Sequence, residues 1–389
     1  MSNIKINGYC DPAFNKVKDT FLTNFNKKKE SGASVSVVLK GKPVVDIWAG
    51  SSDAIGKRDW QEDTIANIYS ATKAMTAVCA LRLVEQGQLD IEKPVSTYWP
   101  EFTGEKKETI TVRMLMNHQA GMVGIKKRLH YRSIYEWDYM ASELAGQAPW
   151  WTPGHGHGYH AVTYGWLLGE VIRRITGKTV GEFLKEEIAE PFDIDIRLGL
   201  DDSEFKRTAF MKPKLLPSIH KDVLKFLWPA IKNPRGAASS AFTNPVSVAL
   251  GVNTKSWKRA EIPSANGHSN GRGLAKFYGI LANGGTDGEK TLLTEETIAM
   301  LSNEESFGLD KVLNVSTRFS LGFMLSQNTK TGAFGPNLKS FGHPGAGGAL
   351  GFADPDAKIG FGYVMNKMDT YILVDPRAKR MIDAVYDCL

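Results

Sequence analysis

Residues 65–73 read Ile-Ala-Asn-Ile-Tyr-Ser-Ala-Thr-Lys, and apolar side chains follow at helical spacing from Met75 and Val78 onward. This order places Ser70 at the N-terminus of a helix and Lys73 on the same face, one turn later. An ammonium group that is partly desolvated near the positive end of a helix can lose its proton and help activate a hydroxyl group. Ser70 is therefore a candidate nucleophile. The alternative is a serine cap followed by a surface lysine.

The same Ser-x-x-Lys spacing also occurs at residues 2–5 and 218–221, so the pattern alone is weak. The preceding segment 65–69 and the apolar helix that follows distinguish the copy at 70–73. Further along the chain, apolar periodicity predicts helices in the middle. They cover residues 71–86, 112–117, 162–176, 180–187, 274–283 and 295–302. Residues 216–264, rich in Pro, Asn and Ser, predict an irregular region of long loops.

The sequence patterns of the two terminal segments predict a different arrangement, in which each segment contains strands and one helix. A helix begins at Asp11-Pro12, and a second begins at Asp375-Pro376. The predicted strands cover residues 35–39, 44–49, 319–325, 349–353 and 359–366. We expect an α/β (α+β) fold in which residues 1–60 and 310–389 form an antiparallel sheet flanked by helices. Residues 61–309 would form a mostly helical subdomain, with the active site between the two parts.

The composition is that of an ordinary folded protein. Its 389 residues are 42% hydrophobic and 23% charged, which excludes a disordered chain. The net charge of +6 is modest, so nucleic acid is not an expected partner. Three cysteines are too few for a disulfide framework and fit a reducing compartment. Residues 1–8 lack the apolar core of a leader, and no apolar run approaches the ~20 residues of a membrane span. We expect a cytoplasmic protein.

Two further motifs compete with Ser70 for the chemistry. Gly267-His268-Ser269-Asn270-Gly271 matches the Gly-x-Ser-x-Gly nucleophile elbow, but no buried strand precedes it, so a glycine-rich loop is favoured. His155, His157 and His160 approach the His-x-His-x-Asp-His pattern of zinc hydrolases, with Tyr159 in place of the acidic member. A solvent-accessible loop is the simpler interpretation. We expect neither a metal nor a cofactor.

A fourth motif pair lies near the C-terminus. Lys330-Thr331-Gly332 reproduces the Lys-Thr-Gly of penicillin-recognising enzymes, but it lies in a predicted turn. His343-Pro344-Gly345 is followed by small residues that lead into an apolar strand. Glycines allow a substrate to approach the backbone, and exposed amides of such a strand can stabilise an oxyanion. We therefore prefer residues 343–345 as the active-site strand and treat Lys330 as a coincidental match.

With Ser70-x-x-Lys73, Tyr159 and His343-Pro344-Gly345 in this order, the chain resembles the serine β-lactamase and penicillin-binding protein superfamily. It is most similar to class C β-lactamases and family VIII carboxylesterases. Residues 159–170 match the second family motif in register, as do the patterns at 115–121 and 151–154. The resemblance extends from the first hairpin to the last helix.

This resemblance implies a role for each matching position. Ser70 would attack the acyl carbon, Lys73 would help to deprotonate it, and Tyr159 would act as general base and acid, with Tyr164 as a weaker candidate. The backbone amides of Ser70 and Ala346 would form the oxyanion hole. Four further residues would contact the substrate, namely Gln119, Trp150, His343 and Gly345.

Two departures from the family pattern shape the functional prediction. Ala161 replaces the Asn of Tyr-x-Asn, and His343-Pro344 replaces Lys-Thr. Both changes remove groups with which β-lactamases contact their substrates. They favour hydrolysis of neutral small-molecule esters, with weak or absent β-lactamase activity. Trp150 and Trp151 could line an apolar pocket, whereas core packing is expected for Trp166.

Several alternatives stay open at this point. The same fold could support a β-lactamase, a D-amino-acid peptidase or an acyltransferase. A non-catalytic binding protein that retained the fold is the alternative from another class. The sequence does not predict the oligomeric state.

Overall fold

The computed structural model describes residues 4–27, 29–214, 221–329 and 331–389. Among these residues, nine strands form one sheet in the order β1-β3-β2-β14-β13-β12-β11-β10-β9, and every neighbouring pair is antiparallel. The strands are β1 (Ile6–Cys10), β2 (Gly32–Leu39), β3 (Lys42–Gly50), β9 (Ser306–Leu309), β10 (Ser316–Phe319), β11 (Met324–Leu325), β12 (Phe341–Pro344), β13 (Leu350–Asp354) and β14 (Ile359–Met365).

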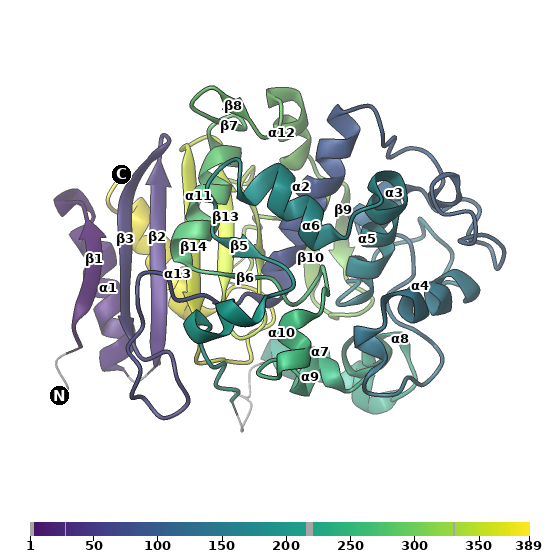
Figure 1. Ribbon diagram of the computed structural model, residues 1–389, viewed down its shortest axis with the longest axis horizontal. Coiled ribbons are helices and arrows are strands. Elements are labelled where there is room, and N and C mark those ends of the chain that lie inside the picture. The colour runs from purple at the N-terminus through teal and green to yellow at the C-terminus, as the bar shows by residue number, and fades with distance from the viewer. Residues whose placement is uncertain (1–3, 28, 215–220, 330) are drawn as a thin grey trace.

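Helix α11 (Gly271–Ala282) covers one face of this sheet and lies across β2 and β14 (Figure 1). The close approach depends on glycine, because a Cβ atom at Gly360 would lie only 2.1 Å from the backbone nitrogen of Gly279. Successive residues of a strand point to opposite faces. The buried side chains of Phe361 and Tyr363 therefore point away from α11, into the layer behind the sheet.

That opposite layer contains helices α1 (Asn15–Asn26) and α13 (Pro376–Tyr386), which pack against each other. Helix α13 begins after Asp375, whose carboxylate accepts a hydrogen bond of 2.8 Å from the backbone N–H of Arg377. In Figure 1 the purple helix α1 and the yellow helix α13 accordingly lie side by side. The predicted antiparallel sheet with flanking helices is confirmed.

The middle of the chain is mainly helical and is built around α2 (Thr72–Glu85), most of whose residues are buried. Helices α5 and α6 pack on α2, and α3 and α4 pack on α5. The bounds in this part are α3 (Val112–Met116), α4 (Trp137–Gly146), α5 (Thr163–Thr176), α6 (Val180–Leu184) and α12 (Glu295–Leu301). Two small sheets, ordered β4-β6-β5 and β7-β8, consist of β4 (Ala66–Asn67), β5 (Ile196–Arg197), β6 (His268–Ser269), β7 (Thr286–Asp287) and β8 (Lys290–Thr291).

Three details differ from the sequence-based expectation. The strand predicted over 319–325 is interrupted, because a turn at Gly322, with φ of +83°, separates β10 from β11 and contacts α2. Strand β1 was not predicted. The region 216–264 is not simply irregular, since its described part contains four short helices, whose bounds are α7 (Lys221–Lys232), α8 (Ala237–Thr243), α9 (Ser247–Leu250) and α10 (Lys255–Arg259).

The division into a terminal sheet part and a middle helical part stays a prediction. Two elements of the segment 61–309 belong to the sheet layer, namely α11, which packs on it, and β9, which is its edge strand. None of the helices in the described part of the chain combines the length and apolar character needed to cross a membrane.

Candidate active site

Ser70 and Lys73 lie where a short 3₁₀ turn, η2 (Tyr69–Ala71), leads into α2. The Ser70 hydroxyl is half-buried, and its Oγ lies 3.4 Å from Nζ of Lys73. Tyr69, directly before the serine, has a φ of +45°, a left-handed conformation that is costly for a bulky residue. The chain therefore turns sharply at Tyr69 and presents the Ser70 hydroxyl beside the lysine.

The Lys73 amine is fully buried and lacks a counter-charge. Its Nζ donates hydrogen bonds to the backbone carbonyl oxygens of Ala161 at 2.7 Å and Ser264 at 3.0 Å. No carboxylate in the described part of the chain forms an ion pair with it. Burial lowers the pKa of Lys73 well below that of an ordinary lysine. A neutral amine can donate to both carbonyls and still direct its lone pair toward Ser70.

Tyr159 completes this group. Its ring lies 4.6 Å from Nζ of Lys73, measured to the ring centroid. Burial raises the pKa of the Tyr159 hydroxyl, and a hydrogen bond with Ser70 only partly opposes this. The phenol is therefore the stable form in the resting protein. Tyr164 lies farther from the amine, at 5.9 Å, and its buried hydroxyl has no partner among the described residues.

His343, on β12, contacts Tyr159 from the other side. Its Nδ1 lies 2.7 Å from the carbonyl oxygen of Pro344, so this nitrogen must carry the proton and donate it. Its Nε2 is then an acceptor, and it lies 3.5 Å from the Tyr159 hydroxyl. Burial lowers the pKa of His343 to about 3. The imidazole is therefore neutral, unlike the lysine found at this position in penicillin-recognising relatives.

The backbone of Tyr159 is held by a buried carboxylate that the sequence analysis missed. Asp310 accepts hydrogen bonds from the backbone N–H groups of Tyr159 at 3.1 Å and of Val312 and Leu313 at 2.8 Å each. Thr317 donates to its second oxygen at 3.2 Å. No local motif indicates this role, because Asp310 is 151 residues away from Tyr159 in sequence.

The loop after His343 contacts the segment that carries Ser70. A Cβ atom at Gly345 would lie 2.1 Å from the carbonyl oxygen of Ile68, so only glycine allows this approach. The following Ala346 is exposed, and its backbone N–H has no acceptor within the described residues. An unpaired amide in a loop that contacts the segment carrying Ser70 has the character of an oxyanion-hole donor, and this role of Ala346 stays a prediction.

A buried ionic cluster anchors this loop from the other side of the sheet. Arg377 donates hydrogen bonds to the carbonyl oxygen of Gly347 at 2.6 Å and to Asp375 at 2.8 and 3.0 Å. It also lies 3.2 Å from the buried Glu30. Burial raises the pKa of Glu30 to about 8 despite the arginine. The residue that follows Ala346 is thereby fixed by α13, near the end of the chain.

The other residues predicted to contact the substrate or line its pocket differ in how far they are buried. Gln119 is half-buried, in the loop after α3. Trp150 is also half-buried, and its indole N–H donates to the carbonyl oxygen of Gly124 at 2.7 Å. Trp151 packs beside Gly158 and Lys311. Trp166 is 1% exposed and belongs to the core, as expected. Contact of Gln119 and Trp150 with a substrate stays a prediction.

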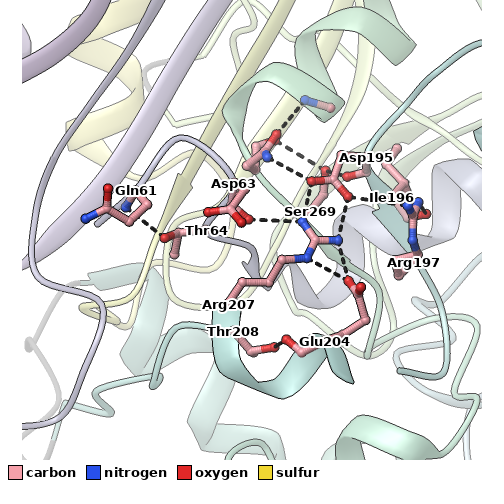
Figure 2. A network of polar contacts seen from close by, with 12 residues as sticks. Gln61, Asp63, Thr64, Asp195, Ile196, Arg197, Glu204, Arg207, Thr208 and Ser269 are labelled. Atoms are coloured by element: carbon pink, nitrogen blue, oxygen red, sulfur yellow. Dashed lines mark hydrogen bonds and ion pairs between the residues drawn. The ribbon is translucent and has the colours of Figure 1, made fainter. Parts of the chain in front are cut away.

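Ser269, the serine of the Gly-x-Ser-x-Gly match, has a structural role in a small sheet (Figure 2). It lies on β6, which pairs with both β4 and β5, and its hydroxyl donates to the carbonyl oxygen of Asp195 at 2.8 Å. The Asp195 carboxylate forms an ion pair with Arg207 at 2.6 Å. The strand thus holds β4, which precedes Ser70, and the Ser269 hydroxyl contacts a carbonyl rather than a base.

Of the three histidines at 155–160, His157 and His160 are buried and have other partners, whereas His155 is exposed. Nδ1 of His160 lies 2.9 Å from the carbonyl oxygen of Gly158, and its Nε2 accepts the backbone N–H of Met122 at 3.0 Å. His157 contacts Thr317 at 2.8 Å. In the described ranges, no group of three or more His, Cys, Asp or Glu side chains could hold a metal ion. Lys330 lies outside the described residues.

Comparison with known proteins shows the family to which the chain belongs. A family model described as Beta-lactamase matches residues 19–385. The chain is 33% identical over 368 residues to "Esterase/beta-lactamase LipL" of Mycobacterium tuberculosis, covering 94% of this chain and 83% of that protein. A crystal structure of a family VIII carboxylesterase is 42% identical, with a TM-score of 0.90 and coverage of 99% of this chain and 100% of its own.

A penicillin-binding protein homologue from Caulobacter crescentus is 37% identical, with the same TM-score of 0.90 and the same coverage of 99% and 100%. EstA from Arthrobacter nitroguajacolicus is 31% identical, with a TM-score of 0.84 and coverage of 98% and 97%. Because the family model spans nearly the whole chain and these likenesses cover it almost completely, the protein belongs to the beta-lactamase family.

Proposed function

We propose that the protein is a serine carboxylesterase that cleaves small-molecule esters through an acyl-enzyme on Ser70. The observation that carries this proposal is the buried Lys73 amine, which has no carboxylate partner among the described residues and lies 3.4 Å from the Ser70 hydroxyl. Relatives whose names include esterase and carboxylesterase support the same reaction class. We further propose a cytoplasmic location, which the three free cysteines support.

The first half of the reaction forms the acyl-enzyme. Neutral Lys73 takes the proton of Ser70 while Oγ attacks the acyl carbon, and the carbonyl oxygen becomes an oxyanion. The backbone amides of Ser70 and Ala346 would stabilise that charge. Tyr159 then donates its proton to the departing alkoxide as the ester C–O bond breaks, and the Lys73 ammonium returns a proton to Tyr159.

The second half runs through the same groups in the reverse direction. Water attacks the acyl carbon and transfers a proton to Lys73 through Tyr159, and Ser70 leaves as a hydroxyl after it regains that proton. Neutral His343 accepts the phenol hydrogen in the resting state and so orients the Tyr159 oxygen toward Ser70. In this scheme Lys73 is the base, and Tyr159 transfers protons without becoming a stable phenolate.

The departures from the β-lactamase pattern support a preference for neutral esters. Ala161 contributes its carbonyl oxygen to Lys73 and has no side-chain amide for a substrate. His343 is neutral, so it offers no cation to the carboxylate of a β-lactam. We therefore expect efficient turnover of short esters and a rate for a chromogenic cephalosporin that is lower by about 10³-fold or more in kcat/KM.

The decisive experiment follows p-nitrophenol release from short-chain esters on the stopped-flow time scale. A burst equal to the enzyme concentration, together with a Ser70-linked acyl adduct in the mass spectrum, is the expected result. Matched assays with esters of graded chain length and with the cephalosporin define the substrate range. Cephalosporin turnover that equals or exceeds ester turnover would contradict the esterase proposal, and absence of any acyl adduct would favour a non-catalytic protein.

A further inference from the structure

Helix α7 presents its apolar side chains to solvent. Leu224, Trp228 and Ile231 recur at positions i, i+4 and i+7, which places them on one face of the helix. Their exposed fractions are 54%, 64% and 67%. Val223, outside this series, is buried and lines a cavity of about 350 Å³ together with Leu309 of β9. An amphipathic helix normally directs such a stripe into the core, so its exposure indicates a surface that binds a partner.

The charge of the surrounding segment indicates which partner fits. Residues 208–259 contain nine lysines and arginines against a single aspartate, a charge of +8 by sequence, whereas the whole chain carries +6. Two of these cations, Lys214 and Arg259, form ion pairs with Asp369 and Asp202 outside the segment. Lys232 ends α7, Arg235 follows it, and both are exposed. Neither forms an ion pair with a carboxylate in the described ranges. The apolar stripe is therefore accompanied by unneutralised positive charge.

We propose that the solvent-facing side of α7 is a docking surface for an anionic lipid bilayer. Basic helices that carry Trp and Leu on one face lie in the membrane interface, where the apolar side chains enter the headgroup region and the cations meet anionic lipids. The helix contains 12 residues, about 18 Å, so it can lie on a bilayer but not cross it. Val246 and Leu250, beside and in α9, are also exposed, and α7 and α9 both pack on α8.

This inference goes beyond the proposed esterase activity and does not depend on it. The test is cosedimentation of the full chain with vesicles of phosphatidylcholine alone, or with about 30% phosphatidylserine added. Wild type is expected to partition at least tenfold more strongly onto the anionic vesicles, and to be released when the salt concentration rises from about 0.1 to about 0.5 M. Ser70→Ala should bind equally, because the active site is not the contact.

The variants separate the surface from the fold. The double variant Trp228→Ser/Ile231→Ser is expected to bind vesicles at least tenfold more weakly than wild type. The control Ile55→Ser, at a 73% exposed position in the loop after β3, is expected to bind them like wild type. All these variants except Ser70→Ala should hydrolyse a water-soluble ester like wild type, which shows that they are folded. Equal binding by Trp228→Ser/Ile231→Ser, or no binding by wild type, would overturn the proposal. A dimer of wild type that this double variant dissociates would assign the surface to a second copy.

Discussion

Ser70 and Ser269 are far apart in sequence, but their segments are neighbours in space, because β4, just before Ser70, pairs with β6. Both serines match a known nucleophile motif, yet their surroundings differ in kind. Beside Ser70 lies a buried amine without a counter-charge, whose hydrogen bonds go to backbone carbonyls. Near Ser269 the carboxylates of Asp195 and Glu204 have cationic partners, since both form ion pairs with Arg207 and Asp195 also lies 3.9 Å from Arg197. Burial without a carboxylate partner among the described residues lowers the pKa of Lys73 and makes it a base, whereas the ion pairs around Arg207 support the small sheet. The surroundings of a serine, more than its motif, therefore indicate its role.

The largest expected difference is between the two serines themselves. Ser70→Ala should lower kcat/KM for a p-nitrophenyl ester by about 10⁴-fold or more, because it removes the nucleophile. Ser269→Ala should keep the rate within about threefold and lower the free energy of unfolding by about 1 kcal/mol, since one neutral hydrogen bond is lost. Urea unfolding and steady-state kinetics measure both. Comparable losses of activity in the two variants would remove the distinction.

Next in size is the effect of Tyr159→Phe, which removes the hydroxyl and keeps the ring. We expect turnover to fall about 100-fold, the usual contribution of general acid and base catalysis. Tyr164→Phe is the matched control and should have little effect, because its hydroxyl has no partner in the described part of the chain. If the two variants lost activity equally, the proton transfer would have to follow another route.

A smaller effect is expected when Lys73 is given the carboxylate that it lacks. Ala161→Asp should raise the pKa of Lys73, keep it charged at pH 7, and lower kcat/KM by about tenfold or more. The activity should recover as the pH rises through the new pKa, because the base is the neutral amine. Ala161→Asn controls for the added volume without a charge. An unchanged pH–rate profile in Ala161→Asp would contradict the role of Lys73 as the base.

The smallest effect concerns the paired cluster. Arg207→Met leaves Asp195 and Glu204 without their common partner and should lower the free energy of unfolding by about 1 to 2 kcal/mol, since these groups are partly exposed. Arg259→Met removes an exposed pair with Asp202 and should cost less than about 0.5 kcal/mol. Activity per folded molecule should persist in both. A catalytic defect in Arg207→Met without loss of stability would mean that this cluster acts on the reaction.

The sequence allowed part of this site to be predicted. Ser70 and Lys73 are one helical turn apart, and the strands at both termini have clear apolar patterns, so local spacing was sufficient. The carbonyl of Ser264, the carboxylate of Asp310 and the guanidinium of Arg377 contact the site only through tertiary folding. No local pattern indicates them. The helices in 216–264 were not predicted because the many Pro, Asn and Ser residues there are typical of loops. The strand predicted over 319–325 was too long because the turn at Gly322 depends on packing against α2, which the local sequence does not indicate.

The anchoring of Gly347 by Arg377 has a consequence for synthesis of the protein. During translation Ser70, Lys73 and Tyr159 are made well before Arg377. A nascent chain that lacks α13 therefore has its nucleophile and base without the ion cluster that fixes the loop after Ala346. A chain truncated before Arg377 would contain every reacting group, but the loop that carries Ala346 would lack this support.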